Sequence, residues 1–130
     1  MRFGHGTDVH RLVPERALVL GGVTIPSELG LLGHSDADVL THAIMDAMLG
    51  AMALGDIGKH FPPSEDRYRD ASSLELLGVV RDLLAEKRAT VIQIDSTLHL
   101  EAPKVAPYVE SMRRNLAEAL GLPVDAVSVK

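Results

Sequence analysis

The sequence predicts an α+β fold: a mixed β-sheet of four to five strands, three helices packed on one face of it, and a small β-hairpin. Two observations support this prediction. Short runs rich in β-branched residues alternate with longer helix-forming runs along the chain. The chain has 130 residues, 46% of them hydrophobic, which suits one core and a single domain over residues 1–130.

Strand patterns occur in four parts of the chain. Residues 2–10 are expected to form the first strand. Residues 18–25 consist of two apolar runs joined by Gly-Gly, which predicts a tight hairpin. Residues 90–100 are rich in Val, Ile and Thr and favour a further strand, and residues 124–130 begin another.

Helix patterns and stop signals define the first two helices. The first is expected from Ala37 to Leu54, with Ser35 as its N-cap and Asp38 three residues later in a variant of the capping box. The second is expected from Ser72 or Ser73 to about Lys87.

The remaining segments predict a third helix and two loops. Ala102-Pro103-Lys104 is expected to open the third helix, because proline suits a first turn, and Gly121 is expected to end it. Residues 55–65 contain helix breakers, and residues 29–36 are glycine-rich and polar, so both are predicted to be loops.

Composition excludes several classes of function. The net charge is −5, and the 13 basic residues are scattered, which argues against nucleic acid or a membrane surface as partner. Because there is no cysteine, a metal ion must be bound by histidines and carboxylates. The N-terminus has no apolar leader and no stretch is long enough to span a membrane, so we expect a cytoplasmic protein acting on small molecules.

A candidate metal site follows from three residues. Asp8 and His10 alternate along the first predicted strand and therefore point to the same side. His42 shares one helix face with Asp38 and Asp46. We expect Asp8, His10 and His42 to bind zinc and leave its fourth position open, with Asp38 or Asp46 accepting hydrogen bonds from imidazole N–H groups. The alternative for His42 is a hydrogen-bonded core histidine.

Three further clusters offer binding groups. His34 and Ser35 precede a predicted helix and suit a phosphate, although ordinary helix capping explains them equally. Asp56 and Gly58 suit a polyol, with a plain turn as the alternative. Lys104 at a helix start suits an anion, with a simple helix entry as the alternative.

Five stretches form a set that is far more specific than any one motif: Arg2–His10, Gly21–Pro26, Gly30–Val39, Gly55–Gly58 with Phe61-Pro62, and Ala102–Lys104. In this order they resemble the 2-C-methyl-D-erythritol 2,4-cyclodiphosphate synthase family over nearly the whole chain. The resemblance implies cyclisation of 4-diphosphocytidyl-2-C-methyl-D-erythritol 2-phosphate to 2-C-methyl-D-erythritol 2,4-cyclodiphosphate, with release of CMP, in non-mevalonate isoprenoid biosynthesis.

The resemblance also implies cofactors and partners. It implies one Zn²⁺ per site on Asp8, His10 and His42, and a second divalent ion, Mg²⁺ or Mn²⁺, between the α- and β-phosphates. The family acts as a homotrimer with active sites between subunits. The enzyme class implied is a metal-dependent phosphorus–oxygen lyase.

Residue roles follow from the same resemblance. His34 and Ser35 match residues that contact phosphate, and Asp56 and Gly58 match residues that hold the erythritol. Ala102, Pro103 and Lys104 match part of the cytidine pocket, with Lys104 also near the phosphates. The expected catalytic set is Asp8, His10, His42, His34 and Lys104.

The family pattern continues beyond the position of Lys130 with a segment that includes a glutamate ligand for the second metal, so we expect this chain to lack that segment. An alternative function is therefore a catalytically impaired, truncated trimeric scaffold that binds zinc or CDP compounds. A zinc phosphohydrolase that activates water at the open position is a third possibility.

Overall fold

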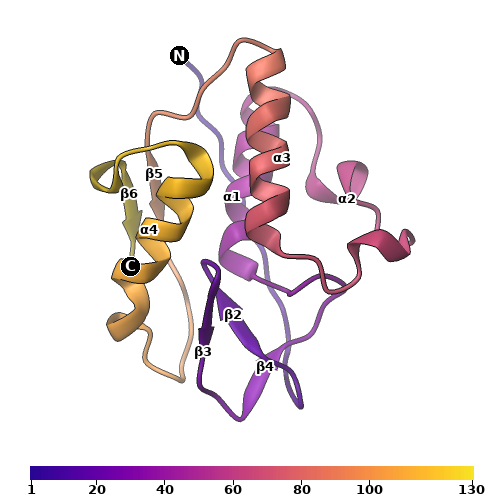
Figure 1. Ribbon diagram of the computed structural model, residues 1–130, viewed down its shortest axis with the longest axis vertical. Coiled ribbons are helices and arrows are strands. Elements are labelled where there is room, and N and C mark those ends of the chain that lie inside the picture. The colour runs from indigo at the N-terminus through magenta and orange to yellow at the C-terminus, as the bar shows by residue number, and fades with distance from the viewer.

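Three helices pack side by side in the computed structural model, which describes residues 1–130. Helix α1 (Val39–Ala51) contacts α3 (Ser73–Glu86), and α3 in turn contacts α4 (Val109–Leu120). The short strands lie beside and below this layer in the view of Figure 1. None of the helices combines the length and the apolar character that crossing a bilayer requires.

The strands confirm the α+β class and the hairpin, but they pair two by two and do not form one sheet of four to five strands. Two pairs are antiparallel and one is parallel. The pairs are β1 (Leu12–Pro14) with β4 (Leu29–Leu31), β2 (Leu18–Leu20) with β3 (Val23–Ile25), and β5 (Ile94–Ser96) with β6 (Val127–Val129).

The N-terminal segment corrects the first strand prediction. Residues 1–10 form no backbone-to-backbone hydrogen bond, and the first such bond joins Leu32 N–H to the Arg11 carbonyl. The segment instead lies against α1, because Gly4 and Gly6 have no side chains. An added Cβ at Gly4 or Gly6 would overlap carbonyl oxygens of that helix. The segment is therefore positioned by helix packing and not by a β-ladder.

Helix α1 starts later than its propensity suggests. Its N-cap is Asp38, whose side chain accepts a hydrogen bond from Thr41 N–H, and not Ser35. Ala37 has a φ of 57°, which interrupts the helical backbone immediately before the cap. The prediction for α3 is confirmed, since Ser72 is the N-cap and the helix ends at Glu86.

The C-terminal third differs from prediction in its boundaries. The third helix does not open at Ala102-Pro103-Lys104: a short 3₁₀-helix, η2 (Ala106–Tyr108), comes first and α4 follows. Pro107 occupies the first turn of η2. The preference of proline for a first helical turn therefore applies to Pro107 and not to Pro103. Gly121 ends α4 in the left-handed conformation, as predicted.

The remaining differences are short elements within predicted loops and short strands within longer predicted ones. Residues 55–65 contain α2 (Ile57–His60), which Asp56 caps, and residues 29–36 contain β4. Of residues 90–100 only β5 is strand, and in the last segment a 3₁₀-helix, η3 (Val124–Ala126), precedes β6. A further 3₁₀-helix, η1 (Asp66–Tyr68), lies between α2 and α3.

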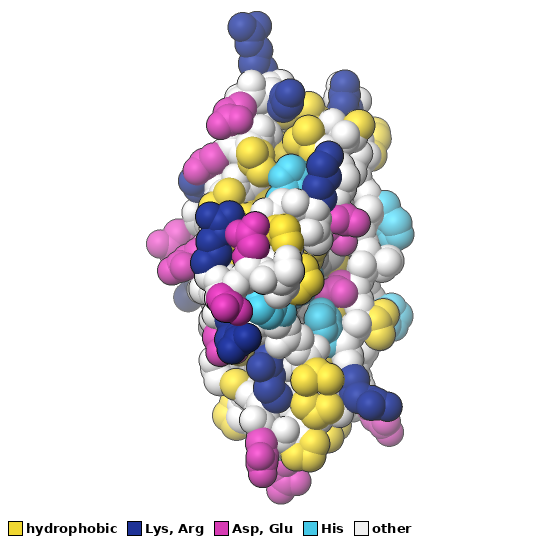
Figure 2. Space-filling view, turned by 90° about the vertical axis from the view of Figure 1, so that its right-hand side faces the viewer, with side chains coloured by type: hydrophobic (Ala, Val, Ile, Leu, Met, Phe, Trp, Pro, Cys, Tyr) yellow, Lys and Arg dark blue, Asp and Glu magenta, His cyan; other side chains and the backbone are white.

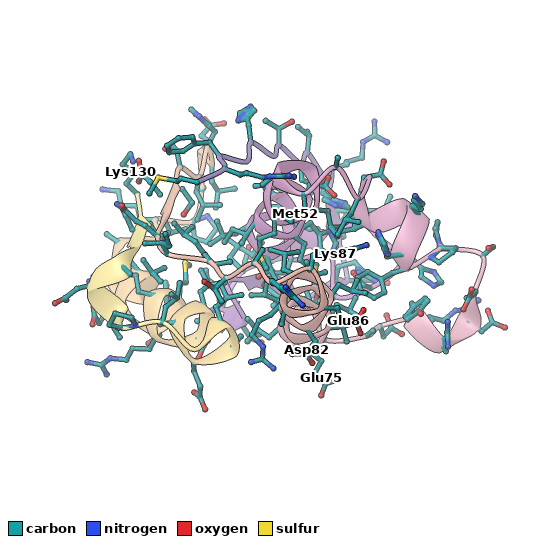
Figure 3. The ribbon with its side chains drawn as sticks, turned by 90° about the horizontal axis from the view of Figure 1, so that it is seen from above. Met52, Glu75, Asp82, Glu86, Lys87 and Lys130 are labelled. Atoms are coloured by element: carbon teal, nitrogen blue, oxygen red, sulfur yellow. The ribbon has the colours of Figure 1, made fainter.

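The core contains 19 buried hydrophobic residues, drawn mainly from the helices and the hairpin. It is filled by aliphatic and methionine side chains such as Met45, Leu77 and Leu116, because only 3% of the chain is aromatic. Looking down on α3, Figure 3 shows Glu75, Asp82 and Glu86 on the side of α3 that faces away from α1. The apolar side of α3 therefore faces the core and its charged side faces solvent.

Candidate metal centre

Asp8, His10 and His42 meet at one point of the structure. The Oδ2 atom of Asp8 lies 2.8 Å from His10 Nε2 and 3.1 Å from His42 Nδ1. All three potential ligand atoms lie within 4.8 Å of one another. Figure 2 shows several histidine side chains reaching the surface on one face of the molecule. His42 is buried and His10 is half-buried, so the cluster is partly shielded from solvent.

Two elements that are far apart in sequence bring these ligands together. His42 stands in the first turn of α1, four residues after the Asp38 cap. The N-terminal segment crosses the same helix, because Gly4 and Gly6 allow its backbone to approach the carbonyls of α1. The close approach of this segment thus places Asp8 and His10 against His42.

The donor set fits a zinc ion. One carboxylate and two imidazoles are common zinc ligands, and three protein ligands leave a position open for a further ligand. Donor atoms of a tetrahedral zinc ion stand about 3.3 Å apart, given bonds of about 2.0–2.1 Å. The separations of 2.8 and 3.1 Å around Asp8 are slightly shorter. A small outward movement of the side chains therefore makes room for an ion.

Hydrogen bonds on the far side of each imidazole orient it toward the centre. The Nδ1 atom of His10 lies 2.7 Å from the Leu32 carbonyl, which can only accept, so Nδ1 carries a proton and Nε2 is the nitrogen that faces Asp8 and the metal position. The Nε2 atom of His42 lies 2.9 Å from Ser73 Oγ and 3.0 Å from Ser35 Oγ.

The expected outer acceptors, Asp38 and Asp46, form no hydrogen bond with either imidazole. Asp38 accepts hydrogen bonds from Gly21 N–H and Gly22 N–H at the hairpin. Asp46 accepts one from Ile57 N–H and so links α1 to α2. A shared helix face puts these carboxylates near His42, but unpaired backbone N–H groups of neighbouring elements compete for them. The prediction is therefore corrected.

The charge state of Asp8 suits a metal ligand. Partial burial acts to raise the pKa of this carboxyl, but the hydrogen bond with His42 and the nearby charge of His10 outweigh it and lower the pKa. Asp8 is therefore anionic at neutral pH. Burial raises the pKa of Asp46, and the neighbouring Asp56 and Asp8 carboxylates act in the same direction.

The predicted phosphate residues surround this centre to different degrees. Ser35 is buried and touches His42 directly. His34 Nε2 lies 3.2 Å from the Glu65 carbonyl, which ties the start of this region to the loop before η1. Ser35 also accepts from Ala37 N–H at 3.3 Å, a local turn contact that does not make it the N-cap of α1. The capping interpretation of Ser35 is therefore wrong, whereas its contact with His42 is compatible with the binding interpretation.

The predicted sugar residues belong to the start of α2, which Asp46 links to α1, and the predicted nucleotide residues are not bonded to the metal centre. Asp56 caps α2 by accepting from Lys59 N–H, and Gly58 lies within that helix. No hydrogen bond or ion pair connects Ala102, Pro103 or Lys104 to the metal centre. The single chain therefore brings the metal ligands together with Ser35, whereas the His34 side chain is bonded to the Glu65 carbonyl. It does not bring the residues expected for cytidine to the centre.

Sequence reasoning missed two groups at the centre. One is the Leu32 carbonyl, a backbone atom that no residue type can reveal. The other is Ser73, 31 residues away from His42, which was expected only as a helix cap. The one signal in the sequence that could have indicated this role is that Ser73 directly follows the N-cap Ser72, so a second serine is present where one suffices for capping.

A model of the YgbB family matches residues 1–130. The chain belongs to the YgbB family. Among the similar proteins is the 2-C-methyl-D-erythritol 2,4-cyclodiphosphate synthase of Alkaliphilus metalliredigens, 60% identical over all of this chain and 82% of the relative. The synthase of Chlorobaculum tepidum is 58% identical over all of this chain and 83% of the relative. The resemblance inferred from the motifs is confirmed.

Solved structures of YgbB-family relatives share the fold. A CDP-bound 2C-methyl-D-erythritol-2,4-cyclodiphosphate synthase superposes with a TM-score of 0.92 at 38% identity, covering 98% of this chain and 85% of that one. The CDP complex of IspF from Plasmodium falciparum has a TM-score of 0.84 at 31% identity, covering 99% of this chain and 79% of that one. Both the sequence and the structural matches extend over essentially the whole chain, which favours a synthase over the scaffold alternative.

Proposed function

We propose that this chain catalyses the cyclisation of 4-diphosphocytidyl-2-C-methyl-D-erythritol 2-phosphate to 2-C-methyl-D-erythritol 2,4-cyclodiphosphate, with release of CMP. The observation that carries the proposal is the convergence of Asp8, His10 and His42 in a chain 60% identical to a synthase of that name. Three ligands with an open position suit a reaction at a phosphate, because phosphoryl transfer depends mainly on positioning and charge stabilisation.

The reaction needs few proton transfers. An oxygen of the 2-phosphate attacks the β-phosphorus, the bond from that phosphorus to the α-phosphate oxygen breaks, and CMP leaves with the electron pair. The nucleophile is already anionic, so no general base is required. A zinc ion held by Asp8, His10 and His42 would supply a Lewis acid beside the reacting phosphate.

The other proposed roles belong to side chains around the centre. His34 and Ser35 bind phosphate oxygens and orient the diphosphate. The contact of Ser35 with His42 and the position of both residues shortly before α1 support these roles. Asp56 accepts hydrogen bonds from the erythritol hydroxyls, and Gly58 leaves room for the sugar. A second divalent ion, Mg²⁺ or Mn²⁺, would supply neutralisation of the negative charge on the diphosphate.

We propose further that Ala102, Pro103 and Lys104 bind the cytidine from a neighbouring subunit of a homotrimer. Two observations support this proposal. The three residues form no hydrogen bond or ion pair with the metal centre of their own chain. The N-terminal segment makes no backbone-to-backbone hydrogen bond and carries Phe3 and Val9 at 88% and 90% exposure, which is typical of a surface that another subunit covers.

One experiment separates this function from its alternatives. The purified protein is incubated with the diphosphocytidyl substrate, Zn²⁺ and Mg²⁺, and its products are followed by ³¹P NMR. The cyclic diphosphate and CMP in equal amounts are expected. Linear erythritol phosphates would support the phosphohydrolase instead, and CDP binding without any CMP release would support the scaffold. Light scattering of the same sample tests the trimer through its mass.

A further inference from the structure

Two hydroxyls contact the outer nitrogen of His42, and one of them is held in a fixed orientation. Ser73 is the first residue of α3 and is fully buried. Its Oγ lies 2.9 Å from His42 Nε2, while Nδ1 of the same ring faces Asp8. The ring of His42 therefore spans from the metal centre to the N-terminus of α3.

The hydrogen of the Ser73 hydroxyl has a partner other than His42. Ser73 Oγ–H donates to Asp36 Oδ1, and Ser73 N–H donates to Asp36 Oδ2 at 3.0 Å. Asp36 is itself anchored, because its Oδ1 accepts from Asp38 N–H at 3.1 Å. The Asp36 carboxylate thus accepts hydrogen bonds from both the hydroxyl and the backbone N–H of Ser73.

The hydrogen bonds between Asp36 and Ser73 determine which nitrogen of His42 carries a proton toward Ser73. A serine hydroxyl has one hydrogen, and an ionised carboxylate can only accept, so the Ser73 hydrogen is committed to Asp36. Ser73 Oγ can then only accept from His42, which requires the proton to be on Nε2. With a proton kept on Nε2, the ring presents Nδ1 to Asp8, where a metal ion can replace the hydrogen of the Nδ1–Asp8 hydrogen bond.

We propose that Ser73, oriented by Asp36, is a positioning residue that holds His42 in the tautomer and ring orientation required for metal binding. The inference rests on the proposed metal centre and adds a member from α3 to it. Ser35 also lies near Nε2, but its hydroxyl accepts from Ala37 N–H and no carboxylate directs its hydrogen. Ser73 is therefore the directed partner of the pair.

The test compares Ser73→Ala with Ser72→Ala in the full chain. Ser72 is the adjacent serine, and its side chain makes no capping hydrogen bond, so it is a matched control. Affinity for Zn²⁺ is measured by competition with a chromophoric chelator, and the ligand field is measured by the visible absorption of the Co²⁺-loaded protein. Ser73→Ala is expected to weaken affinity roughly 10- to 100-fold and to shift the Co²⁺ bands, whereas Ser72→Ala matches wild type.

Asp36→Asn provides a second variant that leaves Ser73 in place. A neutral amide accepts a weaker hydrogen bond from the Ser73 hydroxyl than a carboxylate does. The loss of Zn²⁺ affinity in Asp36→Asn is therefore expected to be smaller than in Ser73→Ala. Metal-free melting curves identify any variant that has simply unfolded. If Ser73→Ala fails to fold, Asp36→Asn decides, and unchanged affinity in that variant overturns the inference.

The two levels of the proposal fail differently. If wild type binds Zn²⁺ tightly and a folded Ser73→Ala binds it equally well with unshifted Co²⁺ bands, the role of Ser73 is wrong and the metal centre stands. If wild type itself does not bind the metal, the metal centre is wrong and the role of Ser73 falls with it.

Discussion

The Oδ1 atom of Asp38 lies 2.9 Å from the backbone nitrogen of Gly21, so the cap of α1 is also an anchor for the hairpin. The same carboxylate accepts from Gly22 N–H, Thr41 N–H and Thr41 Oγ1–H. The side chain is fully buried, and burial raises its pKa even though the four donors act in the opposite direction. One residue therefore links the turn between β2 and β3 to the helix that carries His42.

Removal of the Asp38 side chain tests this anchor. Asp38→Ala leaves several buried donors without an acceptor, and each costs about 1–3 kcal/mol. A loss of at least about 3 kcal/mol in the free energy of unfolding is expected from urea denaturation. Asp82→Ala, at an exposed position of α3, is the control and changes stability by about 0.5 kcal/mol or less. Equal stability of the two variants would refute the anchor.

His42→Ala tests the metal centre. The variant is expected to lose zinc and cyclisation activity, because one of three protein ligands is gone, while the protein stays folded and keeps its assembly. Bound zinc is measured by elemental analysis, activity by ³¹P NMR and mass by light scattering. His99→Ala, an exposed histidine, should retain all three properties. Full activity in His42→Ala would contradict the assigned roles.

Gly6→Ala tests the contact that brings the ligands together. The new Cβ would overlap the carbonyl oxygen of Ala43, so the N-terminal segment must move away from α1. Asp8 and His10 would then separate from His42, and zinc affinity is expected to fall at least about tenfold. In Gly78→Ala the added Cβ meets nothing within 4 Å, so this control retains zinc affinity. It should also gain about 0.5–1 kcal/mol of stability from helix propensity.

The lowered pKa of Asp8 predicts a pH effect on the metal-free protein. A carboxyl whose folded pKa is below its unfolded value of 3.8 stabilises the fold above that value. This contribution is lost as the pH falls through the folded pKa. Wild type should therefore lose more stability than Asp8→Asn between about pH 5 and pH 2. Parallel melting temperatures for the two proteins across this range would disprove it.

The site was predictable from sequence as far as residue types and alternation allow. Asp8 and His10 stand two apart, and His42 stands alone in an apolar helix. The sequence therefore indicated that these residue types can bind a metal, but it did not show that they lie close together. Their outer partners were not predictable in the same way. Asp38 and Asp46 share a helix face with His42, yet their carboxylates are taken by the backbone of the hairpin and of α2.

The sequence by itself determined the local features: the Gly-Gly hairpin, the extent of α3, the end of α4 at Gly121 and the ligand types at the centre. The hairpin and the helix boundaries depend on residues within a few positions of one another, where backbone preferences and capping decide, and the ligand types follow from the residues themselves. Only the tertiary structure decided that residues 1–10 pack on α1 without a strand partner, and that the Ser73 hydroxyl lies within hydrogen-bond distance of His42 Nε2. Those contacts join groups about 30 or more residues apart, so buried donors and acceptors are matched by packing and not by local pattern.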